Sequence, residues 1–250
     1  MAPIPEPLFY HSAAAAEGDL VLVGPEAHHV SVQRLRRGDA IALFDGRGTL
    51  ARGRIAALGR TEVRVEIARR EHAPPPAPRI DLYSAIPKGD RQAVLLEMAT
   101  QLGISRFVPV RWQRSVVEAG ERARERWLRV CIEACKQSRR AYVPELSPPV
   151  GLEEAIAGAR AEGARLVLAH PSEDAVPLGS LDVERTARYA LFIGPEGGLV
   201  DDEVKRLRDC GAAIVRLSDA ILRIEAAAVA LIASLCTLSD RGKTPEAGQA

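Results

Sequence analysis

The sequence has few aromatic residues, few cysteines and no long apolar run, and each shortage excludes a class of protein. Aromatic residues make up 4% of the 250 residues, so extensive stacking of single-stranded bases on aromatic rings is not expected. The four cysteines form no Cys-x-x-Cys pair, which predicts reduced thiols rather than a disulfide framework. No apolar run approaches the roughly 20 residues that span a bilayer, so no membrane segment is expected.

Several short signatures are also missing. Neither Gly-x-Gly-x-x-Gly nor Gly-x-x-x-x-Gly-Lys-[Ser/Thr] occurs, which disfavours a dinucleotide oxidoreductase and a P-loop NTPase. Residues 1–20 lack the basic and apolar regions of a secretory signal, which predicts a cytoplasmic protein. His28 and His29 have no third ligand at a fitting spacing, so no metal site is expected.

The charge is nearly balanced overall but unevenly distributed. The net charge is +1, yet residues 79–145 carry 13 Lys and Arg against 8 Asp and Glu, whereas residues 146–250 carry 11 against 16. Positive charge is therefore concentrated in the middle of the chain, where it can meet the phosphates of a nucleic acid.

A proline-rich segment divides the chain into two predicted domains. Residues 72–78 hold four prolines, which exclude a helix or a central strand and suit a semi-rigid linker, placed at residues 73–78. The domain before it, residues 1–72, contains short strand-like runs with glycine turns, typical of a small β-barrel. A helix over residues 26–37, ending at Gly38, is expected to interrupt these strands.

The second predicted domain, residues 79–250, alternates strands with helices. Apolar residues at three- and four-residue spacing over residues 91–102, stopped by Gly103, predict an amphipathic helix. The other predicted helices cover residues 121–138, 201–210 and 223–238. The predicted strands cover residues 79–86, 106–110, 165–169, 189–193 and 213–217. This alternation predicts an α/β fold with a mostly parallel sheet.

Three of these strands end in segments suited to a ligand. Parallel sheets bind ligands at the carboxyl ends of their strands, here within residues 166–171, 191–199 and 214–223. Gly194, Gly197 and Gly198 allow the backbone to approach a ligand closely. The acidic residues of this loop and of residues 201–203 would repel an anion. A neutral or cationic small molecule is therefore expected there.

The motifs in these segments resemble those of the ribosomal RNA small-subunit methyltransferase E family. The resemblance is carried by Leu-Phe-Ile-Gly-Pro-Glu-Gly-Gly-Leu at residues 191–199 and by Leu-Ser-Asp-Ala-Ile-Leu-Arg-Ile-Glu-Ala-Ala at residues 217–227. Further matching segments lie at residues 28–39, 43–46, 87–91, 99–103, 113–117 and 137–145. Together they cover most of the chain.

The resemblance implies both a fold and an activity. Family members have a PUA-like domain that binds RNA, followed by a SPOUT methyltransferase domain with a C-terminal trefoil knot. They are homodimers with each cofactor pocket near the subunit interface. They use S-adenosylmethionine to methylate N3 of a uridine in 16S ribosomal RNA, without a metal.

Individual residues receive predicted roles on this basis. Cofactor contacts are expected from Leu168, His170, Gly194, Gly198, Leu217, Ser218 and Leu222. Arg223 is the candidate for stabilising the uracil anion, with Glu225 orienting it. RNA contacts are expected from Arg34, Arg36, Lys88, Arg91 and Arg114. His170 is a candidate base, although a His-Pro pair at a strand end equally suits a turn.

The segment at residues 217–227 also departs from the family pattern. Ser218 stands in place of a glycine, Ala220 in place of an arginine, and Ile224 and Ala226 in place of threonines. Two alternatives therefore stay open: another SPOUT specificity on RNA, and a ribosome-assembly protein that binds RNA without catalysis.

Overall fold

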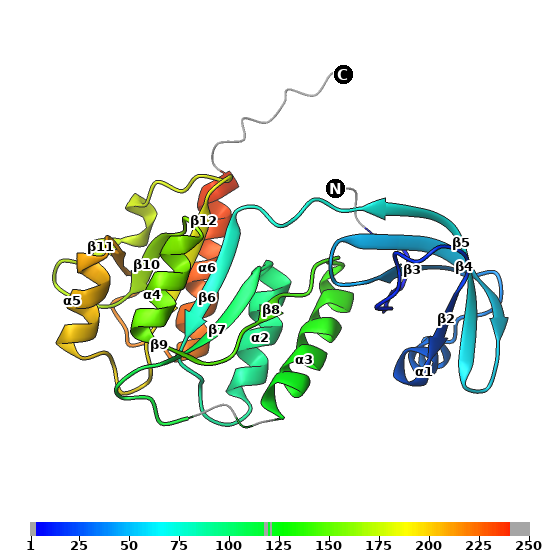
Figure 1. The fold of residues 1–250 in the computed structure, drawn as a ribbon, viewed down its shortest axis with the longest axis horizontal. Coiled ribbons are helices and arrows are strands. Elements are labelled where there is room, and N and C mark those ends of the chain that lie inside the picture. Colours follow the sequence, from blue (N-terminus) through cyan, green and yellow to red (C-terminus); the bar gives the residue numbers. More distant parts are fainter. Residues whose placement is uncertain (1–3, 118–119, 121, 241–250) are drawn as a thin grey trace, which may run out of the picture. The chain divides into compact units, whose positions relative to one another are not determined.

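Contacts divide the chain into two units, each with its own sheet. The computed structural model describes residues 4–117, 120 and 122–240, coloured along the sequence in Figure 1. The first unit comprises the chain up to Pro75 together with Cys131–Val143, and the second comprises Pro76–Val130 and the chain from Pro144 onward.

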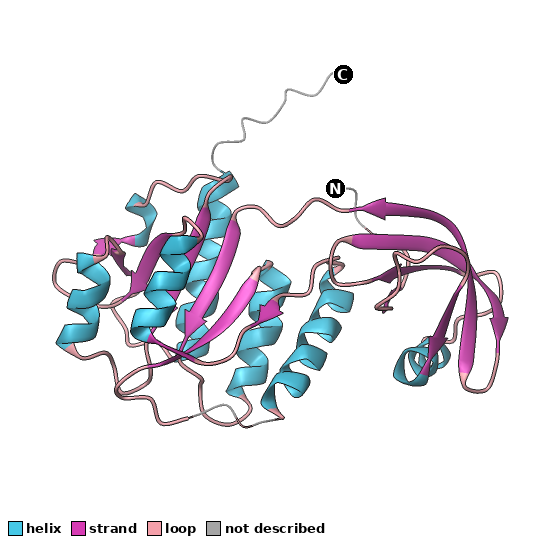
Figure 2. Ribbon diagram, viewed as in Figure 1, coloured by secondary structure: helices cyan, strands magenta, loops and turns pink. Residues whose placement is uncertain are grey.

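The first unit is built on a curled five-stranded sheet (Figure 2). Its strands are β1 (Leu8–Tyr10), β2 (Leu20–Val23), β3 (Ala40–Phe44), β4 (Thr49–Leu58) and β5 (Glu62–His72). The order is β1-β3-β4-β5-β2, with β1 parallel to β3 and the other pairs antiparallel. Because β1 and β2 are edge strands, the sheet is an open half-barrel. The strand-rich character predicted for this region is confirmed.

Helix α1 (Gly24–Val32) is shorter than the sequence predicted. We expected it to continue to residue 37, but Arg34 adopts a left-handed conformation with φ of 57°. The N–H of Leu35 then donates to the carbonyl of Val30 at 3.2 Å. This is a left-handed ending of the kind that usually contains glycine, which is why the arginine-rich sequence gave no stop signal.

The segment Cys131–Val143 packs in the first unit, although the sequence placed it in the second domain. Cys135 and Ala141 are buried in a cluster with Phe44 and Leu50. The buried Lys136 forms an ion pair with Glu26 of α1 at 2.8 Å. A core contact of this kind joins residues about a hundred positions apart, so local sequence patterns do not indicate it.

The second unit contains a parallel sheet, as predicted, and this sheet has eight strands, of which five were predicted. Its strands are β6 (Arg79–Ser84), β7 (Arg106–Arg111), β8 (Glu145–Leu146), β9 (Val150–Gly151), β10 (Arg165–Ala169), β11 (Val176–Pro177), β12 (Arg188–Ile193) and β13 (Ala213–Arg216). The order is β11-β13-β10-β12-β6-β7-β8, with β9 paired to β7. Leu82, Leu168 and Leu191 in its middle strands are fully buried, because helices cover both faces of such a sheet.

Five α-helices and a short 3-10 helix accompany this sheet. They are α2 (Arg91–Leu102), α3 (Ala123–Ser138), α4 (Leu152–Ala161), η1 (Leu178–Ser180), α5 (Asp201–Asp209) and α6 (Ile224–Asp240). Helix α2 has the predicted bounds and ends at the left-handed Gly103. Glu121, the predicted start of α3, lies outside the described residues. Helix α4 was not predicted.

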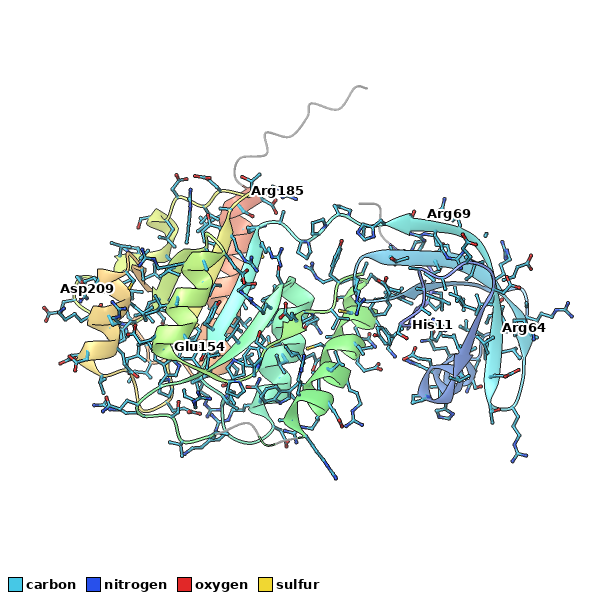
Figure 3. All side chains as sticks on the ribbon, in the orientation of Figure 1. His11, Arg64, Arg69, Glu154, Arg185 and Asp209 are labelled. Atoms are coloured by element: carbon cyan, nitrogen blue, oxygen red, sulfur yellow. The ribbon has the colours of Figure 1, made fainter. Side chains whose placement is uncertain are left out.

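The helices of the second unit form two layers (Figure 1). Helix α4 packs on β7 and β10, whereas α6 packs on the intervening β6 and β12 from the other face, with α2 against it. Figure 3 shows the exposed side chains of Glu154 on α4 and Asp209 on α5. None of the helices formed by the described residues is long and apolar enough to cross a membrane.

Candidate functional site

The carboxyl ends of three neighbouring strands meet in the second unit. β10 lies between β12 and β13, and its last residue, Ala169, pairs with Ile193 and with Val215. The segments that follow these strands enclose a cavity of about 400 Å³, a volume typical of small-molecule sites. The cavity is lined by residues 169–171, 193–199 and 216–222, and by Ile224 and Ala227.

A second cavity, of about 450 Å³, lies at the opposite ends of the same strands. Its wall includes Arg165 at the start of β10 and Ala213 at the start of β13. Arg165 is already engaged in an ion pair with Glu184. Because parallel sheets bind ligands beyond the carboxyl ends of their strands, the first cavity is the candidate site despite its slightly smaller volume.

The glycine loop, residues 194–198, forms one wall of the candidate site. Gly198 has φ of 73°, a conformation that side chains rarely adopt. A Cβ atom on Gly194 would lie 2.8 Å from the side chain of Leu199. The N–H of Gly198 donates to the carbonyl of Pro195 at 2.9 Å, which closes the turn. Glycine is therefore required for the turn itself, and the wall it forms is mostly backbone.

His170 lines the same cavity and has one ring nitrogen without a hydrogen-bond partner among the described residues. Its N–H donates to the carbonyl of Val215 at 3.0 Å, which fixes the residue at the end of β10. Its Nδ1 atom is buried without a hydrogen-bond partner among the described residues. Burial lowers the pKa of His170 below its ordinary 6.5, so the imidazole is neutral at neutral pH. A buried polar atom without a partner is a position where a ligand can supply one.

Two acidic residues near the glycine loop, Glu203 and Glu196, already have partners. Glu203 is 8% exposed, and its carboxylate accepts hydrogen bonds from the N–H of Val200 at 3.0 Å and of Gln113 at 2.8 Å. Glu196 lies 3.6 Å from the guanidinium of Arg91. The carboxylate of Glu203 therefore occupies the amino end of α5, where it would repel a phosphate. The acidic residues of the sequence indicated the same.

Comparison with known proteins identifies the family. A family model described as an RNA methyltransferase domain matches residues 74–236. The ribosomal RNA small subunit methyltransferase E of Mycobacterium bovis is 32% identical over 247 residues, covering 94% of this chain and 92% of that protein. This chain belongs to the ribosomal RNA small subunit methyltransferase E family. The Bacillus subtilis protein of the same name is 27% identical over 220 residues, covering 82% of this chain and 85% of its own.

The likeness to the methyltransferase E family extends through both units. A model described as an RNA methyltransferase PUA domain matches residues 22–68. A structure from Neisseria gonorrhoeae, solved bound to S-adenosyl methionine, has 31% identity and a TM-score of 0.83, covering 93% of this chain and 98% of its own. A Legionella pneumophila methyltransferase in complex with the same cofactor has 27% identity and a TM-score of 0.83, covering 94% and 98%. The predicted family and enzyme class are confirmed.

In this methyltransferase, six of the seven predicted cofactor residues lie around the carboxyl-end cavity. These are His170, Gly194, Gly198, Leu217, Ser218 and Leu222. Leu168 instead lies in the core, fully buried between β12 and β13, and does not line the cavity. The strand rule locates the end of β10 correctly, but alternate side chains of a central strand point into the core. The binding role of the other six stays a prediction.

The predicted catalytic residues, Arg223 and Glu225, lie in the segment that borders the cavity of this methyltransferase. Arg223 is exposed and lies between Leu222 and Ile224, two residues of the cavity wall. Glu225 is half-buried in the first turn of α6, and its Oε2 atom is buried without a partner among the described residues. No ion pair between Arg223 and Glu225 occurs in the described part of the chain, so the structure places the two side chains near the site but does not pair them.

The predicted RNA-binding residues fall into two groups. Arg34 and Arg36 are exposed after α1 in the first unit, and Lys88 is exposed before α2 in the second. Arg91 and Arg114 instead contact the glycine loop, through Glu196 and through the carbonyl of Gly197 respectively. The strands of the first unit carry further exposed cations, such as Arg64 and Arg69 on β5, which Figure 3 labels.

Sequence patterns missed the role of Glu203 in this family member. The residue before α5 is Val200, which has no side-chain acceptor, so no capping signature marks the start of the helix. The partner that Glu203 holds, Gln113, lies 90 positions away. A metal site was not expected from the sequence. The described residues contain no group of three His, Cys, Asp or Glu side chains that could hold a metal ion.

Proposed function

We propose that this protein transfers the methyl group of S-adenosylmethionine to N3 of a uridine in the 16S ribosomal RNA of the small ribosomal subunit. The observation that carries the proposal is the glycine-walled cavity at the carboxyl ends of β10, β12 and β13, in a member of this family. A relative was solved bound to S-adenosyl methionine. Relatives are named for the ribosomal RNA of the small subunit, and the acceptor atom follows from the family resemblance.

The residues around the cavity suit this cofactor. Its sulfonium is cationic, and the wall carries the neutral His170 with the acidic Glu196 and Asp219. Apolar side chains such as Leu217 and Leu222 offer a surface for the adenine ring. The backbone of the glycine loop allows close approach, and the free Nδ1 of His170 gains a hydrogen-bond partner when a polar ligand binds.

The cavity residues position the reaction, and the exposed residues beside it stabilise charge. S-adenosylmethionine supplies an activated methyl group, whose transfer breaks a C–S bond while a C–N bond forms at N3 of the uracil. The N3 proton passes to a base or to solvent water, and negative charge develops on the uracil oxygens as the N–H bond breaks. Arg223 lies beside the cavity with an exposed guanidinium that can donate to such an oxygen. Glu225 Oε2 is available to accept a hydrogen bond and orient this arginine.

The family resemblance carries three further predictions. We infer that the C-terminal part forms a trefoil knot, that the protein is a homodimer, and that it acts in the cytoplasm on ribosomal RNA. The second is measured by sedimentation equilibrium, where a particle of twice the 26.9 kDa chain mass is expected. A particle of one chain mass at micromolar concentration would exclude a stable homodimer.

Mapping of N3-methyluridine in 16S ribosomal RNA tests the proposed activity. A strain lacking the gene is compared with the same strain carrying the wild-type gene or the Gly198→Val variant. We expect the modification to be absent in the deletion strain, restored by the wild type, and restored poorly by the variant.

Other outcomes of this mapping identify the alternatives. Persistence of N3-methyluridine in the deletion strain contradicts the proposed acceptor. Loss of a different methylated nucleotide indicates another SPOUT specificity. An unchanged methylation pattern combined with defective small subunits indicates an RNA-binding assembly protein, an alternative motivated by Ser218, Ala220, Ile224 and Ala226.

A further inference from the structure

A short turn after β7 lies directly against the glycine loop. This turn, residues 112–115, is closed by two hydrogen bonds between Trp112 and Ser115. The N–H of Trp112 donates to Ser115 Oγ at 2.9 Å, and the N–H of Ser115 donates to the carbonyl of Trp112 at 3.0 Å. We call it the β7 turn. These two hydrogen bonds give the β7 turn a defined conformation next to the glycine loop.

One buried carboxylate holds the β7 turn and the glycine loop in register. Glu203 accepts from Gln113 in the turn and from Val200, two residues beyond the loop. Both hydrogen bonds have an ionised acceptor and the side chain is nearly buried, so each bond is stronger than one between neutral groups. A displacement of either segment therefore acts on the other.

Arg114 makes the second connection, and it does so from the solvent side. Its Nη1 donates to the carbonyl of Gly197 at 3.0 Å. A Cβ atom on Gly197 would lie 3.3 Å from the Cβ of Arg114, so the arginine lies along the loop that walls the cofactor cavity. The side chain is exposed. A guanidinium has five N–H donors in a planar fork, and the structure engages one of them on the loop.

We propose that Arg114 is a positioning residue that couples RNA binding to cofactor binding. One N–H of its guanidinium holds the carbonyl of Gly197, and the remaining donors bind a phosphate of the RNA substrate. A phosphate held in this way fixes the guanidinium, and the fixed guanidinium holds the glycine loop in its ligand-binding shape. The proposal rests on the proposed function, because it requires both ligands.

The chemistry of arginine is specific to this double role. A planar fork can serve a carbonyl on one edge and a phosphate on the other, whereas the ammonium of lysine is a point charge at a different reach. Coupling between two ligands is reciprocal, so RNA must strengthen cofactor binding by the same factor by which the cofactor strengthens RNA binding.

The test measures cofactor affinity with and without RNA. Labelled S-adenosylhomocysteine, which cannot react, is titrated into the full-length protein by equilibrium dialysis, alone or with saturating small ribosomal subunits from a strain lacking the gene. For the wild type we expect the subunits to tighten binding by about fivefold or more, the usual lower range of coupling between sites.

Three variants isolate the role of Arg114. Arg114→Lys keeps the charge and is expected to reduce the coupling factor to about one. Arg114→Gln removes both the charge that a phosphate requires and the long reach of the guanidinium, and is also expected to lose the coupling. Lys88→Gln is the matched control. Lys88 is an exposed, predicted RNA contact that has no hydrogen bond or ion pair with the loop among the described residues, so RNA affinity should fall while the coupling stays.

The possible results are distinguishable. A wild-type protein that binds both ligands with a coupling factor of one, or an Arg114→Lys variant that keeps the wild-type factor, overturns the role of Arg114 and leaves the proposed function standing. A folded wild-type protein that binds neither S-adenosylmethionine nor its product overturns the proposed function itself.

Discussion

The two ends of the parallel sheet in the second unit are built from opposite kinds of contact. Near the amino ends, Asp81 of β6 is 0% exposed, and its Oδ2 atom accepts from Arg106 of β7 at 2.9 Å and from Arg188 of β12 at 2.7 Å. Both arginines also pair with Glu162. At the carboxyl ends, the wall of the cavity combines backbone, apolar side chains and the neutral His170 with the exposed charges of Glu196, Arg216 and Asp219.

The difference indicates which end holds the sheet together and which end is reserved for a ligand. At the amino ends, burial opposes ionisation of Glu162, but the hydrogen bond from Arg106 and the charges of both arginines outweigh it and lower its pKa. Those charges are engaged with one another. At the carboxyl ends, His170 Nδ1 and Glu225 Oε2 have no partner among the described residues. Substitutions at the two ends should therefore affect different properties.

The largest effect is expected at the amino ends, on stability. Asp81→Asn removes the buried charge between Arg106 and Arg188 and should lower the free energy of unfolding by about 3 kcal/mol, the lower range for breaking a buried ion pair. Chemical denaturation measures it. The exposed Glu153, paired with Arg206, provides the control: Glu153→Gln should leave the unfolding midpoint unchanged.

This substitution also tests the comparison directly. Folded Asp81→Asn protein should bind S-adenosylmethionine with wild-type affinity, because Asp81 lies at the other end of the strands. Folded Asp81→Asn protein that binds the cofactor poorly would contradict the division of roles between the two ends.

The next largest effect is expected on catalysis. Arg223→Gln should lower kcat by about 100-fold, the usual cost of removing one donor to a developing anion. Stability and cofactor affinity should stay near wild type, because the side chain is exposed. Single-turnover methylation of small subunits measures the rate. An unchanged rate would remove Arg223 from the reaction.

A smaller effect is expected for the glycine loop. Gly198→Val forces a β-branched residue into φ of 73°, a strain of about 1–3 kcal/mol. If the loop must adopt this shape, the strain corresponds to about 5- to 150-fold weaker cofactor binding. Gly158→Val on α4 is the control, since open space surrounds that glycine and its φ is ordinary. Wild-type affinity in Gly198→Val, measured calorimetrically, would exclude the loop from the site.

The smallest effect is a dependence on pH. Burial lowers the pKa of His170 below 6.5, so cofactor affinity should be constant above that pH. It should fall as the pH drops through the pKa, because an imidazolium repels the sulfonium, by at most about tenfold per pH unit for one proton. Titrations at several pH values measure this, and His170→Asn should show no such fall. An identical fall in His170→Asn would assign the effect to another group.

The sequence predicted much of the second unit because its signals there are local. Helix α2 has an amphipathic pattern and a glycine stop, and β10 and β12 are short buried runs, so all three were located to within a residue. Helix α4 was missed because the residue before it, Gly151, has no side chain to cap the helix, and because the helix contains Gly158. The end of α1 was missed because an arginine, rather than a glycine, takes the left-handed position.

The segments that line the candidate site were predictable from the sequence, whereas the contacts that hold these segments in place were not. The three strand ends follow from the geometry of parallel sheets, which applies without knowledge of the packing. The contacts of Gln113 with Glu203 and of Arg114 with Gly197 join residues 90 and 83 positions apart. No local pattern indicates such pairs, and for this reason Arg114 was predicted only as an RNA contact.

A crystal structure of the protein with S-adenosylmethionine tests the central claim most directly, because the sheet offers a cavity at each end. We predict that the cofactor occupies the carboxyl-end cavity, between residues 169–171, 193–199 and 216–222, with a polar atom of the ligand bonded to His170 Nδ1. Cofactor bound instead in the amino-end cavity beside Arg165 and Ala213, or a folded protein that binds none, would contradict the account.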